Sequence, residues 1–478
     1  MIERSELFIN GEWTRPVDGE VTDVVEAATE DVIGRVALAG PADVDRAVAA
    51  AEEAGRGEWG SLSDNDRADR IEAFADSVKS RAKQTAELVS RQNGMPIKLS
   101  TGANGHLPAI LLNYYAGLIR DRQDDVRPGV GGTRTLVRAM PIGVVGTITP
   151  WNYPQALAAM KLAPALAAGC SIVLKPPPET ALDAFTFAEA ALEANLPAGV
   201  INIVPGGREA GARLAAHPGV AKIAFTGSTA AGRAIGAECG RLLKPVTLEL
   251  GGKSAAILTE DVDLQQYLTA LPRVSLPNSG QTCHSSTRIL APRSRYGEIV
   301  DAITDTVSGL RIGNPLERET QIGPMVSAAQ RERVLDYIAI GKGEGARLTT
   351  GGSRPFDSDR GWFVEPTVFA DVDNTMRIAR EEIFGPVLCV IPYSDEDEAV
   401  AIANDSDYGL AGTIWTADEQ HGVELSRRIH TGSIGVNHYG LDPAAPFGGV
   451  KASGYGRELG PEGLAPYIST QSVYLPAG

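Results

Sequence analysis

Between residues 142 and 250 the sequence alternates between short apolar runs rich in β-branched residues and longer alanine-rich amphipathic runs. The predicted strands begin about 20 to 30 residues apart, which is typical of βαβ units. These strands are Ile142–Thr149, Ser171–Lys175, Val200–Val204, Lys222–Phe225 and Val246–Leu250. The helical runs between them are Gln155–Ala168, Leu182–Ala194, Glu209–Ala216 and Ala230–Arg241. This rhythm predicts an α/β fold in which helices cover both faces of a parallel sheet.

The connections that follow several of these strands begin with glycine or proline. The residues are Pro150, Pro176, Pro205, Gly227 and Gly251. The carboxyl ends of parallel strands share one edge of the sheet, and open α/β sheets bind their ligands at that edge. We therefore expect functional residues to gather there.

The segments outside this region follow other patterns. The first 125 residues look mostly helical, with Val44–Ala54 and Arg67–Gln92 as the clearest amphipathic runs. Val126–Met140 is rich in Gly, Arg and Thr and interrupts that pattern. Beyond residue 255 the alternation returns and predicts a second α/β unit, with strands at Ser286–Leu290, Val387–Ile391, Gly412–Trp415 and Ser433–Val436.

Charge and hydropathy exclude several classes of protein. The chain has 44 Lys and Arg against 60 Asp and Glu, a net charge of −16, whereas nucleic-acid binding requires a concentrated basic face. Met1–Phe8 lacks the apolar core of a signal peptide. The longest nearly apolar stretch, Leu107–Ile119, is too short to cross a membrane. We expect neither a nucleic-acid partner nor a membrane span.

The four cysteines lie far apart, at Cys170, Cys239, Cys283 and Cys389. No Cys-x-x-Cys or Cys/His pair has zinc-binding spacing, so we expect no metal site. This usage favours a reduced, cytoplasmic protein in which each thiol is either buried or chemically active.

Neither of the two common nucleotide-binding fingerprints is complete. The chain has no Gly-x-Gly-x-x-Gly, and Gly227–Gly232 has P-loop spacing but is followed by Arg233 and Ala234 instead of Lys and Ser/Thr. What remains is a strand that ends at Phe225-Thr-Gly-Ser228 and leads into a helix. Such a turn can bind an anion through free N–H groups, or Ser228 can serve only as a helix cap.

Cys283 differs from the other cysteines in its neighbours. It lies in the polar stretch Asn278–Thr287, whereas Cys389 lies in an apolar run and Cys170 in an alanine-rich one. Polar surroundings and partial exposure favour a reactive thiolate, although an incidental loop thiol would fit the same pattern. His284 is adjacent, but neighbours in a strand point to opposite faces, so the two do not form a Cys–His dyad.

Two further polar residues stand out, one inside a predicted strand and one directly after another. Glu249 lies in the apolar run Val246–Leu250, where its carboxylate is either on a solvated face or desolvated with a raised pKa that suits a general base. Asn152 lies in Pro150-Trp-Asn-Tyr-Pro154, where rigid flanks hold an amide that can stabilise an oxyanion or simply form a turn.

Together these segments resemble the aldehyde dehydrogenase superfamily, and the resemblance covers nearly the whole chain. The step of 34 residues from Glu249 to Cys283 also agrees with that family. The matching segments, in the family's order, are Phe8–Trp13, Asp43–Val48, Pro150–Pro154, Phe225–Ser228, Glu249–Lys253, Gly280–Cys283, Glu381–Val387 and Pro446–Lys451.

The resemblance implies that the chain oxidises an aldehyde to its carboxylic acid with transfer of a hydride to NAD(P). Cys283 would attack the carbonyl as a thiolate, and Asn152 and the Cys283 N–H would hold the oxyanion. Glu249 would activate the water that hydrolyses the resulting thioester. Relatives that acylate coenzyme A typically lack this glutamate, which disfavours a CoA-acylating semialdehyde dehydrogenase. The presence of Cys283, Glu249 and Asn152 argues against a catalytically silent relative with a structural or binding role.

The resemblance also assigns the cofactor residues. Lys175 would contact the adenosine ribose, Gly227 and Ser228 the pyrophosphate, and Glu382 the nicotinamide ribose. The residues implied to line the two ends of the cofactor cleft are Phe225 and Gly211 on the adenine side, and Trp151, Leu250 and Phe384 on the nicotinamide side. Many NAD-preferring relatives carry Glu three residues after the lysine, where this chain has Pro178 followed by Glu179. We expect NAD, with NADP also possible.

By family position the aldehyde pocket is implied to contain Tyr153, Met160, Thr282, His284 and Phe447. No arginine lies at an evident anchor for a substrate carboxylate, so apolar aldehydes are favoured over dicarboxylic semialdehydes. The implied organisation is a Rossmann-like cofactor domain (1–125 and 141–253), a catalytic α/β domain (254–445) and a small β oligomerisation arm (126–140 and 461–478). The arm implies a homodimer or homotetramer.

Overall fold

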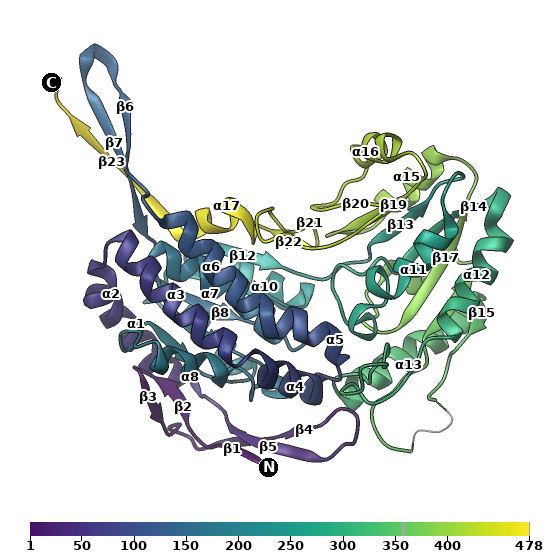
Figure 1. Cartoon of the computed structure of the whole chain (residues 1–478), viewed down its shortest axis with the longest axis horizontal. Coiled ribbons are helices and arrows are strands. Elements are labelled where there is room, and N and C mark those ends of the chain that lie inside the picture. The colour runs from purple at the N-terminus through teal and green to yellow at the C-terminus, as the bar shows by residue number, and fades with distance from the viewer. Residues whose placement is uncertain (356–358, 478) are drawn as a thin grey trace.

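The computed structural model describes residues 1–355 and 359–477, and it contains two large sheets made mainly of parallel strands (Figure 1). Helices pack on both faces of each sheet. The α/β fold class predicted from the βαβ rhythm is therefore confirmed.

The first sheet contains the five strands predicted between residues 142 and 250 and three short antiparallel strands at its edges. Its order is β22 (Gly454–Tyr455), β12 (Val246–Glu249), β11 (Lys222–Thr226), β8 (Val144–Ile148), β9 (Ser171–Lys175), β10 (Ile201–Ile203), β2 (Leu7–Ile9) and β3 (Glu12–Thr14). Thr226 pairs with Glu249, and Ile148 pairs with Lys175, so four carboxyl ends lie at one edge. Every residue of β8, β9 and β11 is buried, which explains their nearly continuous apolar sequences.

Two groups of helices enclose this sheet. The helices on one side are α7 (Pro154–Ala168) and α8 (Phe185–Glu193), with α3 (Asp64–Ser80) and α6 (Leu107–Ile119) packed outside them. The helices on the other side are α1 (Pro41–Arg56), α9 (Arg208–Ala216) and α10 (Thr229–Arg241). The expected amphipathic run Arg67–Gln92 is divided at Arg81 into α3 and α4 (Ala82–Asn93).

The second sheet is built from residues 255–436 and has one antiparallel edge strand. Its order is β15 (Arg347–Thr350), β16 (Thr367–Ala370), β17 (Val387–Tyr393), β14 (Arg288–Pro292), β13 (Ala255–Leu258), β19 (Gly412–Trp415) and β20 (Gly435–Val436). Its helices are α11 (Leu264–Val274) and α12 (Tyr296–Ser308) on one face, and α13 (Ala328–Gly343), α14 (Arg377–Arg380), α15 (Glu396–Asn404) and α16 (Glu419–Ser426) on the other.

The prediction of a mostly helical N-terminal segment is wrong for residues 2–37, which contain five strands. β2 and β3 extend the first sheet, and a separate small sheet has the order β1 (Ile2–Arg4), β5 (Val32–Ala37) and β4 (Val21–Val25). Strands of three residues are too short to show a repeating pattern. Their pairing depends on contacts distant in sequence, such as Phe8 opposite Ile203.

A three-stranded antiparallel sheet projects from the body of the molecule (Figure 1). It is formed by β6 (Asp125–Pro128), β7 (Arg134–Pro141) and β23 (Ile468–Leu475), and all eight residues of β23 pair with β7. Two segments that the sequence analysis assigned to one arm, Val126–Met140 and the C-terminal tail, are therefore paired with each other.

Short elements connect these layers. They are α2 (Glu58–Ser61), α5 (Ile97–Ser100), η1 (Thr101–His106), η2 (Val130–Gly132), η3 (Pro178–Thr180), η4 (Pro277–Gly280), η5 (Arg293–Arg295), β18 (Tyr408–Gly409), β21 (Val450–Lys451), α17 (Gly460–Leu464) and η6 (Ala465–Tyr467). In the described part of the chain, no helix combines the length and the apolar character that a membrane crossing demands. The division into three domains with the boundaries given above stays a prediction.

Candidate active site

The loop that carries Cys283 lies between η4 and β14 and has an unusual backbone. Asn278, Ser279 and Gly280 have φ values of 49°, 57° and 76°, all in the left-handed region. A Cβ atom at Gly280 would lie 2.1 Å from the carbonyl oxygen of Gly385, so only glycine allows this close approach. The approach brings the loop of Cys283 against the loop that contains Glu382.

Cys283 is the most exposed of the four cysteines, because the other three are buried and it is half-buried. Burial raises the pKa of its thiol to about 12, and the carboxylates of Glu382 and Glu249 add to that increase. The backbone N–H groups of His284 and of Cys283 itself lower the pKa in part. In this environment the thiol is protonated at neutral pH and requires a base before it can act as a nucleophile.

Glu249 ends β12 and is only 2% exposed, so its side chain does not lie on a solvated face. Neither carboxylate oxygen has a hydrogen-bond partner among the described residues. Burial raises its pKa well above the ordinary value; Glu458 raises it further, whereas Lys161 lowers it. A desolvated carboxyl group with a raised pKa has the properties of a general base that works near neutral pH.

Next to Glu249 lies a buried ion pair that the sequence analysis did not identify. Lys161 Nζ lies 2.6 Å from a carboxylate oxygen of Glu458, and it also donates a 2.6 Å hydrogen bond to Thr226 Oγ1. Both charged side chains are at most 2% exposed. The sequence did contain one signal, because Lys161 is the only charged residue in the apolar helix α7.

Asn152 directs its amide toward the loop of the nucleophile. It is 3% exposed, and its Nδ2 donates a 3.0 Å hydrogen bond to the carbonyl oxygen of Gln281, two residues before Cys283. An amide nitrogen carries two N–H groups, and this bond uses one of them. The other is available to an oxygen atom that develops negative charge beside Cys283.

Lys175 and Gly211 face each other at the carboxyl edge of the first sheet. A Cβ atom at Gly211 would contact the Lys175 side chain at 3.6 Å. Lys175 Nζ donates hydrogen bonds to the carbonyl oxygens of Gly206 (2.6 Å) and Pro176 (3.2 Å). Burial lowers the pKa of Lys175 to about 8, while Glu179 raises it.

The turn from β11 to α10 combines a close contact with a helix cap. A Cβ atom at Gly227 would lie 2.5 Å from Cζ of Phe225, so the ring occupies the space that a side chain would need. Ser228 Oγ accepts a 3.3 Å hydrogen bond from the N–H of Ala231. Ser228 is thus a helix cap, and the first N–H groups of α10 point out at the same edge of the sheet.

Glu382 and Phe384 line a pocket together with Thr282, the residue before Cys283, and Trp151 contacts Phe384. Glu382 Oε1 accepts a 2.9 Å hydrogen bond from the N–H of Gly252, and burial raises the pKa of Glu382 to about 7. The rings of Trp151 and Phe384 meet edge to face with their centroids 5.3 Å apart. Phe384 has a φ of 61°, and Gln330 Nε2 donates a 2.8 Å hydrogen bond to its carbonyl oxygen.

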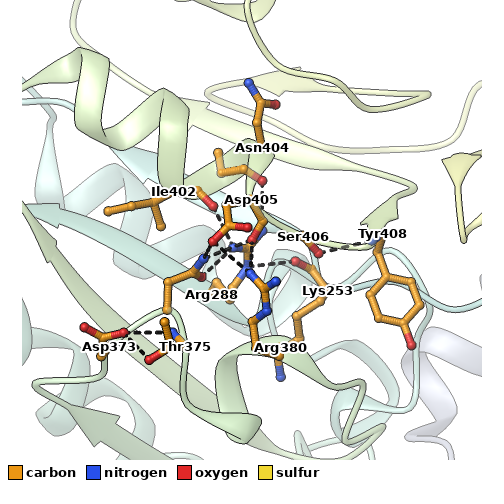
Figure 2. Close-up of polar contacts among 12 residues, drawn as sticks. Lys253, Arg288, Asp373, Thr375, Arg380, Ile402, Asn404, Asp405, Ser406 and Tyr408 are labelled. Atoms are coloured by element: carbon orange, nitrogen blue, oxygen red, sulfur yellow. Dashed lines mark hydrogen bonds and ion pairs between the residues drawn. The ribbon is translucent and has the colours of Figure 1, made fainter.

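Arg288 connects this region to the second sheet and was also missed by the sequence analysis. Its Nε donates a 2.9 Å hydrogen bond to the carbonyl oxygen of Lys253, and its Nη1 donates one of 2.9 Å to that of Ile402. Figure 2 shows the guanidinium group among these oxygens. It also donates hydrogen bonds to Asn374 Oδ1 (2.8 Å) and to the carbonyl oxygen of Ala403 (3.0 Å). It is 1% exposed, and burial lowers its pKa to about 10. These bonds fix the loop that carries Gly252 and, through it, Glu382.

The residues assigned to the aldehyde pocket divide into two groups. The Tyr153 hydroxyl and Thr282 Oγ1 lie 2.8 Å apart, and Met160 is buried in the apolar cluster against which Tyr153 packs. His284 stacks on Tyr439 at 5.0 Å and meets Phe447 edge to face at 6.4 Å. Burial lowers the pKa of His284 to about 4, so this imidazole is neutral at physiological pH.

A pocket beside Tyr439 and Phe447 has mostly uncharged walls. Its apolar side chains are those of Ile434, Val436, Leu441, Ala445, Pro446, Phe447 and Leu459. Its ionisable side chains besides Tyr439 are the exposed His438 and Asp442. Tyr439 was not predicted from the sequence, because its distance of 156 residues from Cys283 gave no local signal.

No group of His, Cys, Asp and Glu in the described residues has a geometry suited to a metal ion.

Comparisons with known proteins identify a family and several similar enzymes. The model of the aldehyde dehydrogenase family matches residues 13–473. A geranial dehydrogenase from Castellaniella defragrans is 54% identical over 476 residues, covering 99% of both chains. A betaine aldehyde dehydrogenase from Rhizobium etli is 40% identical and covers 98% of this chain and 97% of its own. An aldehyde dehydrogenase from Mycobacterium tuberculosis, solved with NAD+, superposes with a TM-score of 0.97 at 48% identity, covering 100% and 99% of the two chains.

Alkylation of Cys283 by iodoacetamide is expected to accelerate with pH. The pKa of about 12 means that the reactive thiolate is scarce at neutral pH, and each unit of pH below the pKa should change the rate about tenfold. Intact-mass analysis of aliquots between about pH 7 and 10 measures the rate constant. Cys283→Ser is the control and should remain unlabelled, because the other cysteines are buried. A rate that stays flat over this range would contradict the assigned thiol environment.

Proposed function

The chain belongs to the aldehyde dehydrogenase family, and from this premise we propose that Cys283, Glu249 and Asn152 are its catalytic residues. The enzyme is an NAD(P)-dependent aldehyde dehydrogenase that oxidises an aldehyde to its carboxylic acid. A CoA-acylating activity and a catalytically silent role are not favoured. The observation that carries the assignment is a thiol and an unpartnered, desolvated carboxyl group that interact at one edge of the first sheet.

The first step forms a bond between Cys283 Sγ and the aldehyde carbon. The thiol loses its proton to solvent water, the thiolate attacks the carbon, and the carbonyl oxygen takes the negative charge of a tetrahedral thiohemiacetal. The second N–H of Asn152 Nδ2 is free to donate to that oxygen, together with the Cys283 backbone N–H. Because these donors are held in place before the reaction, they stabilise charge without further rearrangement.

The second half of the reaction releases the acid. When bound, the nicotinamide cofactor would supply the acceptor for the hydride of the thiohemiacetal carbon. Loss of this hydride leaves a thioester on Cys283. Glu249 then removes a proton from water, and the resulting hydroxide attacks the thioester carbon. The C–S bond breaks, the carboxylic acid leaves, and the proton returns to the Cys283 sulfur. A raised pKa makes Glu249 a stronger base than an ordinary carboxylate, which suits this proton transfer.

The residues at the cleft fit a dinucleotide cofactor. Free N–H groups at the start of α10, beside Gly227 and Ser228, suit a pyrophosphate. Lys175 and Gly211 leave room at the ribose of the adenosine, and Phe225 and Leu250 supply apolar walls. Glu382 is held by Gly252 at a place that suits the nicotinamide ribose, with Trp151 and Phe384 against the ring.

We propose NAD as the preferred cofactor, with NADP also used. Pro178 has no carboxylate, but the exposed Glu179 is close enough to influence Lys175 electrostatically. A carboxylate beside the ribose repels the additional phosphate of NADP. In this chain the carboxylate lies one residue later, at Glu179, which weakens the discrimination against NADP without removing it.

For the substrate we propose an apolar, uncharged aldehyde. The two curated relatives act, by their names, on geranial and on betaine aldehyde, of which the first is neutral and the second cationic. Aliphatic and aromatic walls dominate the pocket, and His284 is neutral. Among the residues that line this pocket, Asp442 is the one with a carboxylate, and it lies at the exposed rim, so a cation that loses its hydration against the apolar walls finds little compensation there.

We also propose that the three-stranded arm joins copies of this chain into a homodimer or homotetramer. Val126, Val130 and Tyr474 are 55%, 96% and 81% exposed on or beside its strands, where they cover no other part of the same chain. The strands β6 and β23 form the two open edges of this sheet.

A cytoplasmic location is proposed from the four free thiols.

The variant Glu249→Gln is expected to stop after the first half of the reaction. The amide preserves the shape of the side chain but cannot accept the proton of water, so kcat should fall about 10²- to 10⁴-fold. One equivalent of reduced cofactor should form per subunit, and intact mass should show an acyl group on Cys283. Glu419→Gln, an exposed carboxylate outside the site, should turn over normally. No adduct, or an adduct on another residue, would refute the proposed nucleophile.

Two aldehydes of the same shape test the substrate proposal. Betaine aldehyde and 3,3-dimethylbutanal differ only in a quaternary nitrogen that replaces a quaternary carbon. The value of kcat/KM should be at least about tenfold higher for the neutral compound, because the pocket does not compensate a charge. Geranial and octanal should be good substrates, and succinic semialdehyde a poor one. Each assay is run with NAD and NADP, and higher kcat/KM is expected with NAD. A preference for betaine aldehyde or succinic semialdehyde would overturn the proposal.

The assembly proposal is tested by a single substitution on the arm. The variant Tyr474→Asp places a charge on an exposed strand residue, so the fold should be retained while the oligomer is weakened. Light scattering on the native chain and the variant at micromolar concentration, with circular dichroism as a check of folding, gives the answer. A monomeric native chain would contradict an oligomer held by the arm.

A further inference from the structure

We propose that Asn93 is a positioning residue for the oxyanion site, acting through the backbone of Asn152. The inference rests on the catalytic role proposed for Asn152. Asn93 is the last residue of α4, more than 50 positions before Asn152 in the sequence, and is completely buried. Its side-chain hydrogen bonds go to the backbone of Met95 and to the two peptide groups that flank the Cα of the oxyanion donor, Asn152.

The hydrogen bonds of the Asn93 side chain determine its orientation. Its Oδ1 accepts a 3.0 Å hydrogen bond from the N–H of Met95. This bond places the NH₂ group on the opposite side, where Nδ2 donates to the carbonyl oxygens of Trp151 (3.1 Å) and Asn152 (3.0 Å). All the N–H groups of the amide are thus used on two successive peptide units. Gly94, with a φ of 79°, ends the helix at this point and turns the chain away.

The carbonyl oxygen of Asn152 also accepts a hydrogen bond from the loop of the nucleophile. Asn278 Nδ2 donates to it at 3.1 Å, from a position five residues before Cys283. In return, Asn152 Nδ2 donates to the carbonyl oxygen of Gln281. Two hydrogen bonds of opposite direction therefore join the Asn152 residue to the nucleophile loop, and Asn93 supports the same peptide from the side of α4.

This arrangement limits the rotation of Asn152. A side-chain amide points where its backbone and its own hydrogen bonds direct it, and the Oδ1 atom of Asn152 has no partner among the described residues. The peptide on each side of the Asn152 Cα is therefore a main constraint on the direction of Nδ2. Loss of the two bonds from Asn93 would leave two buried carbonyl oxygens with fewer donors and would allow the peptide to rotate. Small displacements of an oxyanion donor reduce its effect on the transition state strongly.

Two variants of Asn93 separate hydrogen bonding from packing. Asn93→Asp has almost the same volume but places an oxygen against the two carbonyl oxygens, whereas Asn93→Ala removes the group. Both should lower kcat/KM for the aldehyde by about 10- to 100-fold, which is part of the effect typical of one oxyanion donor. The cofactor dissociation constant and the rate of Cys283 alkylation should change less than about twofold, because neither depends on the oxyanion.

The matched control is Gln92→Ala, at the neighbouring position of the same helix end. Gln92 is equally buried, at 1% exposure, and its amide bonds to Asp183 Oδ1 and to the N–H of Leu182 without contacting Asn152. Its loss should lower the melting temperature as Asn93→Ala does, yet leave kcat/KM within about twofold. If Gln92→Ala reduces activity as much as Asn93→Ala, or if Asn93→Asp retains full activity, Asn93 has only a structural role and the inference is overturned.

A double-mutant cycle with Asn152→Ala completes the test. Asn152→Ala alone should lower kcat/KM by about 10²- to 10³-fold. If Asn93 acts through Asn152, the addition of Asn93→Ala to this background should cost less than about twofold more. Equal losses in both backgrounds would overturn the positioning role while leaving Asn152 catalytic. Full activity of Asn152→Ala would instead refute the proposed role of Asn152 and the inference together.

Discussion

The carboxyl group of Glu249 loses its contact with water at the buried end of β12, and the chemistry of the site depends on this desolvation. Moving a charged carboxylate out of water is costly, so the group is held nearer to its neutral form. The neighbouring Lys161 offsets part of that cost, and Glu458 balances the charge of Lys161. The result is a carboxyl group with a raised pKa that is not locked into an ion pair and can therefore accept a proton from water.

The same edge of the first sheet must also hold Cys283, which comes from a different part of the fold. Contacts across the two sheets make this possible. Gly280 allows the nucleophile loop to touch Gly385, and Arg288 fixes the loop of Lys253 through carbonyl oxygens alone. A buried guanidinium group with oxygen acceptors on all sides is satisfied without a carboxylate partner. No additional acid is thus introduced beside Glu249 and Glu382, whose pKa values would otherwise rise further.

Much of the fold could be predicted from the sequence because buried parallel strands and covering helices have strong periodic patterns. α6 has the bounds of the longest apolar run, and β19 those of a predicted strand. The strands of residues 2–37 were missed because each is short and gains its pairing from distant residues. Among functional candidates, Cys283 and Glu249 stood out through unusual local neighbours. Lys161, Arg288, Asn93 and Tyr439 act through partners far away in sequence, and only Lys161 has a local signal, as a lone charge in an apolar helix.

The residues that hold the site in place are mostly neutral amides, and electrostatics gives a reason for this choice. Asn93, Asn278, Gln281 and Gln330 all bond to backbone groups of the loops around Cys283. A charged residue in the same positions would act over several ångströms in a medium of low polarity and would shift the pKa values of Cys283, Glu249 and Glu382. An amide acts over the length of one hydrogen bond and leaves these values almost unchanged. The positions of the loops around Cys283 can therefore be set by neutral amides, whereas the pKa values of the reacting groups are set by the few buried charges.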